Sequence, residues 1–238
     1  MPRIRLDKFV SDCGVATRRE IKQMVKAGRI SVNGEVAKTP DIKLDPETSV
    51  VTLDGNILKY EKFHYYMLNK PAGVLSATDD GKQKTVIDLL SPEMQKMGLF
   101  PVGRLDKDTT GLLIITDDGD FAHRVISPKS EIVKVYNACT ESPVNDADVR
   151  AFKDGITLAD GTKCLPAELR LLDDGSCLVM VMEGKYHQVK RMLASRGKPV
   201  TALKRLKIGE LELDESLKPG EFRALSQNEL CRVIRKNN

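Results

Sequence analysis

The spacing of apolar residues over residues 1–58 predicts two short helices followed by small strands. Three apolar residues lie on one face of the first helix: Leu6, Phe9 and Val10. Thr17 and Glu20 match a capping box, in which each side chain accepts a hydrogen bond from a free backbone N–H of the other residue. We therefore expect a second helix that is capped at Thr17 and stops at Gly28. Its apolar stripe consists of Ile21, Met24 and Val25.

Two turn signals follow this second helix. Asn33-Gly34 separates two short apolar segments, which is a strong short-range signal for a β-hairpin. Asp54-Gly55 follows the β-prone run 50–53 and adds another small strand pair. Two helices and a hairpin with a basic outer face form a compact module suited to RNA, and the polar residues 59–62 end it as a linker.

Residues 63–238 mix strand and helix patterns. Strands are expected at 63–68, 112–116, 131–138, 167–172, 178–182, 200–208 and 211–213. Helices are expected at 85–90, 120–126, 146–152 and 186–196, with Asp120 as the N-cap of the second. Because the strands and helices do not alternate regularly, we predict an α+β domain in which helices flank a mixed, largely antiparallel sheet. The chain thus divides into a small α/β module at 1–58, a linker at 59–62 and a larger domain at 63–238.

The composition is that of a globular protein rather than a disordered one, with 41% hydrophobic and 30% charged residues among 238. No apolar run approaches the roughly 20 residues that a membrane span needs. The first residues carry no apolar signal core, so we expect a cytoplasmic protein. The five cysteines are too far apart for a zinc site, and their odd number argues against a disulfide framework.

The net charge of +4 hides two basic concentrations. Residues 1–29 contain eight basic and three acidic side chains, and residues 183–207 contain eight basic and one acidic. One such cluster is most simply explained as a solvated surface. Two clusters, one of them rich in arginine, favour a polyanionic partner that is bound through phosphate contacts.

A short acid-rich loop stands directly before the β-prone run 112–116. Asp106 and Asp108 have the spacing of calcium ligands, but Pro101 and Gly103 break the helix that would enter such a loop, so we reject a calcium site. A loop carboxylate paired with a neighbouring basic residue is one interpretation of Asp106. A catalytic carboxylate is the other, because functional groups concentrate on loops that a rigid element positions.

Two later segments offer partners for Asp106. Tyr136, on the alternating strand, is either a core or rim tyrosine or an aromatic platform on which a nucleobase stacks. In the helix expected at 186–196, three donors share one face: His187, Lys190 and Arg191. They form either a solvated basic surface or a binding site for phosphates or a carboxylate.

The N-terminal module resembles the S4 RNA-binding domain in three segments: Arg5–Phe9, Ala16–Ile21 and Gly28–Gly34. This resemblance implies binding to structured RNA. It implies no particular activity, because such domains occur in proteins of several functions.

The order of all these motifs resembles the RsuA-type pseudouridine synthases over essentially the whole chain. The matching segments of the second domain are Leu68–Gly73, Gly103–Leu112, Lys134–Tyr136, Glu183–Met192 and Leu203–Gly209. The resemblance implies that Asp106 is the catalytic residue, that Tyr136 stacks on the target base and takes part in proton transfer, and that Lys190 pairs with Asp106. Many relatives have arginine in the place of Lys190; lysine keeps the charge without the bidentate fork.

Converting uridine to pseudouridine replaces the C1′–N1 bond by a C1′–C5 bond, so the reaction requires no redox change, group donor, cofactor or metal. Asp106 has to be ionised, and a nearby Lys190 or Arg104 favours that form. The base has to leave its stack to reach a pocket, so we expect basic residues to hold the flanking RNA. The expected RNA contacts are Arg104, His187, Gln188, Arg191, Lys204 and Arg205 in the second domain and Arg18, Arg19 and Arg29 in the first.

The enzymes that the sequence most resembles modify uridine 516 of 16S rRNA. We therefore expect 16S rRNA, in precursor particles of the small subunit, as the partner of a monomeric enzyme. Two alternatives stay open: an enzyme that acts on 23S rRNA, and a non-catalytic S4-domain factor for ribosome assembly. The motifs barely distinguish an enzyme for 16S rRNA from one for 23S rRNA, because the choice of site depends on RNA shape. Residues 103–136 argue against the second, since a protein that only binds RNA has no reason to contain them.

Overall fold

The computed structural model describes residues 3–234, which form two compact units. One unit contains the chain up to His64 together with Leu90–Leu99. The other contains Tyr65–Leu89 and the chain from Phe100 onward. Whether the functional domains end where the sequence pattern places them, at residues 58 and 63, stays a prediction.

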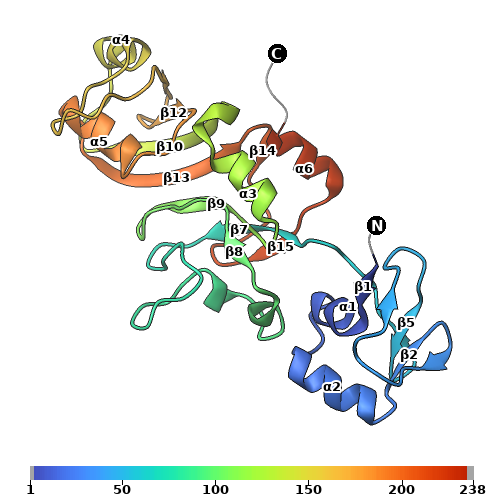
Figure 1. Cartoon of the computed structure of the whole chain (residues 1–238). Coiled ribbons are helices and arrows are strands. Elements are labelled where there is room, and N and C mark those ends of the chain that lie inside the picture. The colour runs from blue at the N-terminus through green and yellow to red at the C-terminus, as the bar shows by residue number, and fades with distance from the viewer. Residues whose placement is uncertain (1–2, 235–238) are drawn as a thin grey trace. The chain divides into compact units, whose positions relative to one another are not determined.

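The first unit combines short helices with small antiparallel sheets (Figure 1). Its elements are β1 (Ile4–Arg5), α1 (Leu6–Asp12), α2 (Arg18–Lys26), β2 (Ile30–Val32), β3 (Glu35–Val36), β4 (Lys43–Leu44), β5 (Val51–Leu53), β6 (Asn56–Ile57) and the 3-10 turn η2 (Met94–Met97). One sheet has the order β3-β2-β5-β6, and β1 pairs with β4. Asn33 and Gly34 join β2 to β3 with φ angles of 51° and 86°, which confirms the predicted hairpin.

The capping box predicted for the second helix is present at the start of α2. Oγ1 of Thr17 accepts a hydrogen bond from the backbone N of Glu20 (3.3 Å), and Oε2 of Glu20 accepts one from the backbone N of Thr17 (2.7 Å). Apolar residues of α1, α2 and β2 form the core of this unit: Leu6, Phe9, Val10, Ile21, Val25 and Ile30. The basic residues of α2 are therefore left on its exposed side.

The second unit is built on one sheet with the strand order β11-β12-β10-β13-β9-β7-β15, to which β8 adds at β9 and β14 at β13. The strands are β7 (Tyr65–Lys70), β8 (Phe100–Pro101), β9 (Thr110–Thr116), β10 (Lys134–Thr140), β11 (Glu168–Leu171), β12 (Cys177–Val181), β13 (Val200–Ile208), β14 (Leu211–Glu212) and β15 (Phe222–Ala224). The β13–β9 pair is parallel and the other pairs are antiparallel. This confirms the predicted α+β class with a largely antiparallel sheet.

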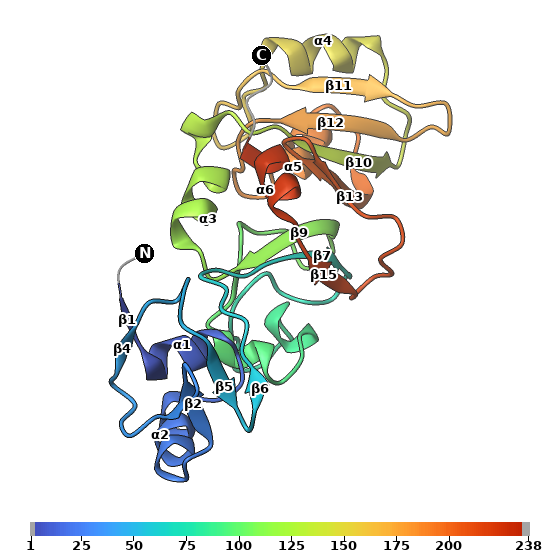
Figure 2. The ribbon, with the colours of Figure 1, turned by 90° about the vertical axis from the view of Figure 1, so that its right-hand side faces the viewer.

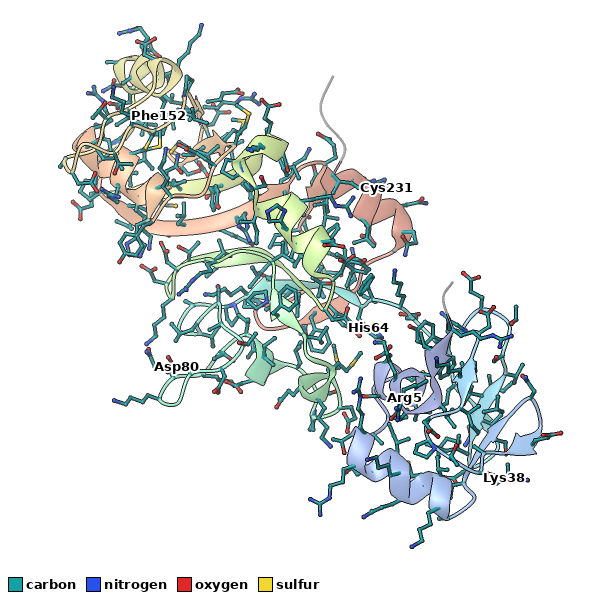
Figure 3. The ribbon with its side chains drawn as sticks, viewed as in Figure 1. Arg5, Lys38, His64, Asp80, Phe152 and Cys231 are labelled. Carbon is teal, nitrogen blue, oxygen red and sulfur yellow. The ribbon has the colours of Figure 1, made fainter. Side chains whose placement is uncertain are left out.

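Helices cover this sheet and close its cores. They are α3 (Gly119–Ile126), α4 (Asp146–Asp154), α5 (Gln188–Ser195) and α6 (Gln227–Ile234), with the 3-10 turns η1 (Ile87–Leu89) and η3 (Pro128–Ser130). Figure 2 shows β11, β12, β10 and β13 as neighbours, with α4 beyond β11. Phe152 of α4 (Figure 3) is fully buried in one core, together with Val179 and Met192. Residues 112–115 of β9 are fully buried, which confirms the predicted central strand.

Three helix predictions in this unit are wrong in detail, including the helix expected at 186–196, which begins only at Gln188. Residues 85–90 form only the short turn η1, because the Asp88 carboxylate accepts hydrogen bonds from the Thr85 backbone N (2.7 Å) and hydroxyl (3.1 Å) and closes a tight turn. Asp118, not Asp120, caps α3: it accepts from the backbone N of Phe121 (3.0 Å) and from the hydroxyl of Tyr65 (2.6 Å). No helix within residues 3–234 combines the length and apolar character that crossing a membrane requires.

Candidate active site

Gly111 allows the acid-rich loop and β13 to lie together. Gly111 pairs with Arg205 in the parallel β9–β13 ladder and has a φ of 99°. A Cβ atom at this position would lie 2.2 Å from the carbonyl O of Arg205, so a side chain has no room. The close approach places the start of β9, and with it the preceding loop, beside the middle of β13, at Lys204 and Arg205.

The Lys70 ammonium fixes the backbone of the same loop. Lys70 is fully buried at the end of β7, and its Nζ donates hydrogen bonds to four carbonyl oxygens at distances of 2.9–3.3 Å. The acceptors belong to Pro71, Asp106, Lys107 and Thr109. Burial lowers the pKa of Lys70 to about 8, although Asp108 and Asp106 act in the opposite direction.

The Asp106 carboxylate lies between two basic side chains. Its Oδ1 is 3.3 Å from Nε2 of His187, and its Oδ2 is 3.2 Å from Nζ of Lys190. Lys190 also contacts Oδ1 of Asp108 at 2.5 Å. Burial on its own would lower the pKa of Lys190, but the hydrogen bonds to Asp108 and Asp106 outweigh it and raise the pKa. The lysine therefore stays charged beside the carboxylate.

His187 reaches Asp106 because it stands outside the helix. The helix predicted from residue 186 begins only at Gln188, since His187 adopts a left-handed conformation with φ 48° and ψ 34°. This backbone conformation is strained for residues other than glycine, and such strained residues are found preferentially at functional sites. The imidazole stacks on the ring of Tyr186, with centroids 3.9 Å apart and planes 17° apart.

Tyr136 and Arg205 are direct neighbours across β10 and β13. Nε of Arg205 donates to the carbonyl O of Leu112 (2.8 Å), and Nη1 lies 3.4 Å from the hydroxyl of Tyr136. The guanidinium carbon is 5.9 Å from the centre of the tyrosine ring. Tyr136 is half-buried and Arg205 is 5% exposed, so the arginine supports the ring from within the protein.

These side chains line one cleft of the second unit, with a volume of about 1050 Å³. Its lining includes Asp106, Tyr136, His187 and Arg205. A smaller recess of about 70 Å³ shares Asp106 and Tyr136 and adds Lys190. The cleft is large enough for a nucleoside. Among residues 3–234, no three His, Cys, Asp or Glu side chains gather as a metal ion would need.

Comparison with known protein families assigns both units. Residues 64–195 match the family of RNA pseudouridylate synthases, and residues 4–50 match the S4 domain. The chain belongs to the RNA pseudouridylate synthase family. It is thus an RNA pseudouridine synthase, an isomerase, of the RsuA type.

Relatives of this synthase match it over nearly their full length. An uncharacterized RNA pseudouridine synthase of Bacillus subtilis is 44% identical, over 95% of this chain and 97% of its own. The ribosomal small subunit pseudouridine synthase A of Vibrio cholerae is 41% identical, over 97% and 99%. A crystal structure of a pseudouridylate synthase superposes with a TM-score of 0.69 at 36% identity, and the match covers 97% of this chain and 100% of that one.

Some of the residues that the sequence predicts for the active site lie together, and others contact different parts of the synthase. His187 and Lys190 meet at Asp106, whereas Arg191 pairs with Asp160 (2.5 Å). Gln188 was expected at the RNA, yet its side chain is 5% exposed. Its Nε2 donates to Glu183 (2.8 Å) and its Oε1 accepts from the backbone N of Lys185 (3.0 Å), so it holds the turn before α5.

The other basic residues expected at the RNA also differ in exposure. Arg104 lines the cleft, is exposed, and forms no ion pair within residues 3–234. Lys204 is exposed, unlike the buried Arg205 beside it. In the S4 unit Arg18 and Arg19 are exposed, and Arg29 is engaged by Asp54 at 2.5 Å.

Sequence reasoning missed two lysines of the synthase. Lys70 ends the apolar strand β7, and Lys134 begins β10; they are 0% and 8% exposed. A charged residue within a strand that is otherwise buried is the signal that could have identified Lys70. Lys134 belongs to the motif around Tyr136, but its place in the sequence indicates no role for it.

Proposed function

We propose that this synthase isomerises a uridine of 16S ribosomal RNA, with Asp106 as its catalytic carboxylate. The observation that carries the proposal is the Asp106 carboxylate, held between Nε2 of His187 and Nζ of Lys190 in a cleft that Tyr136 also lines. The target is supported by relatives. The proteins of Vibrio cholerae and Haemophilus influenzae that are 41% and 37% identical are named ribosomal small subunit pseudouridine synthase A.

Asp106 acts at the sugar or at the base in this proposal. A carboxylate either attacks a carbon as a nucleophile or stabilises the positive charge that develops at C1′ when the glycosidic bond weakens. Lys190 is a positioning residue: its ammonium holds one carboxylate oxygen of Asp106 and leaves the other toward His187. The same ammonium of Lys190 also contacts Asp108. Holding the two carboxylates therefore does not require the bidentate guanidinium of arginine.

Tyr136 receives the target base. Its ring is half-buried, is backed by Arg205 and lines the cleft, as an aromatic stacking platform requires. The hydroxyl is placed at the edge of a stacked base, where a proton leaves C5 once the new C1′–C5 bond has formed. The base reaches the ring only after it has been flipped out of its RNA structure.

Exposed basic groups hold the flanking RNA. Arg104 and Lys204 are exposed on the catalytic unit, and Arg18 and Arg19 are exposed on the S4 unit. They supply phosphate contacts, which give affinity without selecting a sequence. We assign the target to uridine 516, in a precursor particle of the small subunit, and the enzyme to the cytoplasm as a monomer.

The target is tested by mapping pseudouridines in ribosomal RNA from cells that lack the gene. The proposal predicts the loss of one pseudouridine, at position 516 of 16S rRNA, and its return when the gene is restored. Loss of a pseudouridine from 23S rRNA instead would contradict the proposed target. Unchanged ribosomal RNA would contradict action on the ribosome altogether.

A further inference from the structure

Two basic side chains lie beside Tyr136 in the cleft and have no acidic partner. Lys134 is 8% exposed and Arg205 is 5% exposed, and both line the cleft. Within residues 3–234 neither forms an ion pair, and Lys134 forms no hydrogen bond through its side chain. Buried charges are normally paired, because removing a charge from water is costly. Two unpaired cations in one cleft therefore indicate an anion that arrives with the substrate or forms from it.

The sheet register places both cations next to the tyrosine ring. Lys134 and Tyr136 are two residues apart on β10 and share a face. Across the ladder Lys134 pairs with Ile208, and Tyr136 pairs with Arg205. These two partners are three residues apart on β13, so a bulge at this point returns Arg205 to the face of Lys134. Regular pairing would have turned the arginine to the other face.

Arg205 is held on one side and has a free donor on the other. Its Nε is bonded to the carbonyl O of Leu112, and its Nη1 contacts the hydroxyl of Tyr136. Its Nη2 is buried and has no hydrogen-bond partner within residues 3–234. A buried donor without a partner is unfavourable, so a turn of the guanidinium that brings Nη2 to an acceptor of the substrate lowers the free energy.

Lys134 is kept in an environment that disfavours its own charge. Its direct neighbours on the adjacent strands are the apolar Val181 and Ile208. Burial lowers the pKa of Lys134 to about 8, and the positive charge of Arg205 acts in the same direction. No carboxylate offsets these effects. An anion next to both groups would stabilise the ammonium and satisfy the guanidinium.

The reaction itself produces such an anion on the base. When the C1′–N1 bond breaks, its electron pair stays on N1 and spreads onto the oxygens O2 and O4 of uracil. When a nucleophile adds to C6 instead, the charge spreads onto O4. The base becomes anionic by either route, and a base stacked on Tyr136 directs its edge toward the side chains that flank the ring. The proposed phosphate contacts use other side chains, the exposed arginines and lysines.

We propose that Lys134 and Arg205 form an anion-stabilising pair for the uracil ring during isomerisation. In the cleavage route, the C1′–N1 bond breaks with both electrons on the base, and Nζ of Lys134 and Nη2 of Arg205 hydrogen-bond to the ring oxygens. The detached base turns, the electron pair at C5 forms the bond to C1′, C5 loses its proton and N1 gains one. Atoms and electrons balance without a co-reactant. The proposal rests on the placement of the target base over Tyr136.

The direct test is single-turnover kinetics of Lys134→Met on small-subunit particles assembled on a 16S rRNA transcript labelled with tritium at C5 of uridine. We expect the rate constant at saturating enzyme to fall at least about 100-fold, as when one donor to a developing oxyanion is removed. The Kd for the particles should stay within about threefold, because the charge forms only after binding. Wild-type tritium release on these particles tests the proposed target, and the ratio of variant to wild type tests the anion pair.

Lys207→Met is the matched control. Lys207 lies on β13 opposite Val135, on the face of the sheet turned away from Lys134, and pairs with Glu210 at 3.2 Å. Its variant should keep the wild-type rate constant within about twofold. The pair would be refuted if Lys134→Met reacted as fast as Lys207→Met, or if its defect were confined to Kd and the salt dependence of binding, as for a phosphate contact.

If Lys134→Met does not fold, the pH dependence of the reaction provides a second test. In the wild type, Lys134 loses its proton as the pH rises through about 8, so the single-turnover rate constant should fall above that pH. The charged and titratable groups adjacent to it are Arg205, which stays charged, and Tyr136. Lys70, which holds the Asp106 loop, has a pKa of about 8 as well. In Lys134→Arg, which stays charged throughout, the fall should therefore become clearly smaller while activity is retained. An identical fall in this variant would overturn the role of Lys134.

Discussion

Nζ of Lys190 lies 3.2 Å from Oδ2 of Asp106. The same ammonium contacts Asp108 at 2.5 Å, and these two hydrogen bonds raise the pKa of the lysine despite its burial. One positive charge thus compensates two carboxylates of the same loop. A lysine thus holds both carboxylates of the loop without the bidentate fork of arginine.

Replacing Lys190 should show whether catalysis needs the positive charge at this position or the shape of the lysine side chain. In Lys190→Met the Asp106 carboxylate loses its closest cation, and we expect the single-turnover rate constant to fall about 100-fold. Lys190→Arg keeps the charge and should retain activity within about tenfold of wild type. Both are measured by tritium release from labelled RNA. Equal activities of the two variants would contradict a role for the charge.

Removing the Lys70 ammonium should loosen the loop that contains Asp106. Lys70→Met removes a donor from four backbone carbonyl groups, of which those of Asp106 and Lys107 keep a second donor in the backbone N of Thr109 and Gly73, so we expect the free energy of unfolding to fall by about 2–4 kcal/mol. Chemical denaturation measures this change. Lys82→Met, at an exposed position, is the control and should change stability by less than about 0.5 kcal/mol. Equal stabilities of the two variants would argue against Lys70 as the residue that holds the loop of Asp106.

Gly111→Ala should disrupt the pairing of β9 with β13. The new Cβ would meet the carbonyl O of Arg205 at 2.2 Å, and the φ of 99° is strained for alanine. We expect a loss of more than about 4 kcal/mol, or no folded protein, by thermal unfolding. Gly119→Ala is the matched control, because nothing lies within 4 Å of the added methyl group. A Gly111→Ala protein as stable as this control would show that the strands do not need the close approach.

The exposed arginines of the S4 unit should contribute affinity and not chemistry. In the double variant Arg18→Gln and Arg19→Gln, the slope of log Kd against log salt should fall by about two. The rate constant at saturating enzyme should stay as in wild type. Lys38→Gln, an exposed position of the same unit (Figure 3), should leave the slope nearly unchanged. If the slope does not change in the double variant, α2 is not part of the RNA interface.

Local sequence signals predicted the elements that depend on neighbouring residues. The box of Thr17 and Glu20 and the turn at Asn33-Gly34 act within four residues of the chain, so the pattern determines them. The N-cap of α3 was misplaced by two residues for the opposite reason. Asp117, Asp118 and Asp120 are all possible caps by sequence, and the contact that distinguishes Asp118 comes from Tyr65, more than fifty positions away.

The candidate site was predictable in its members but not in its arrangement. The motifs identified Asp106 and Lys190, and the structure places them in contact. The burial of Arg205 could not be read from the chain, because it depends on a bulge between β10 and β13. The left-handed conformation of His187 was missed as well, since helical spacing continues through it and only the tertiary fold shows where α5 begins.

The most direct test of the account is Asp106→Asn. The substitution keeps the size of the side chain and removes its charge, so we expect single-turnover tritium release from labelled 16S rRNA to fall more than about 1,000-fold. The Kd for RNA should remain within about threefold of wild type, and thermal unfolding should show a folded protein. Wild-type rates of pseudouridine formation by Asp106→Asn would contradict the assignment of Asp106 as the catalytic carboxylate.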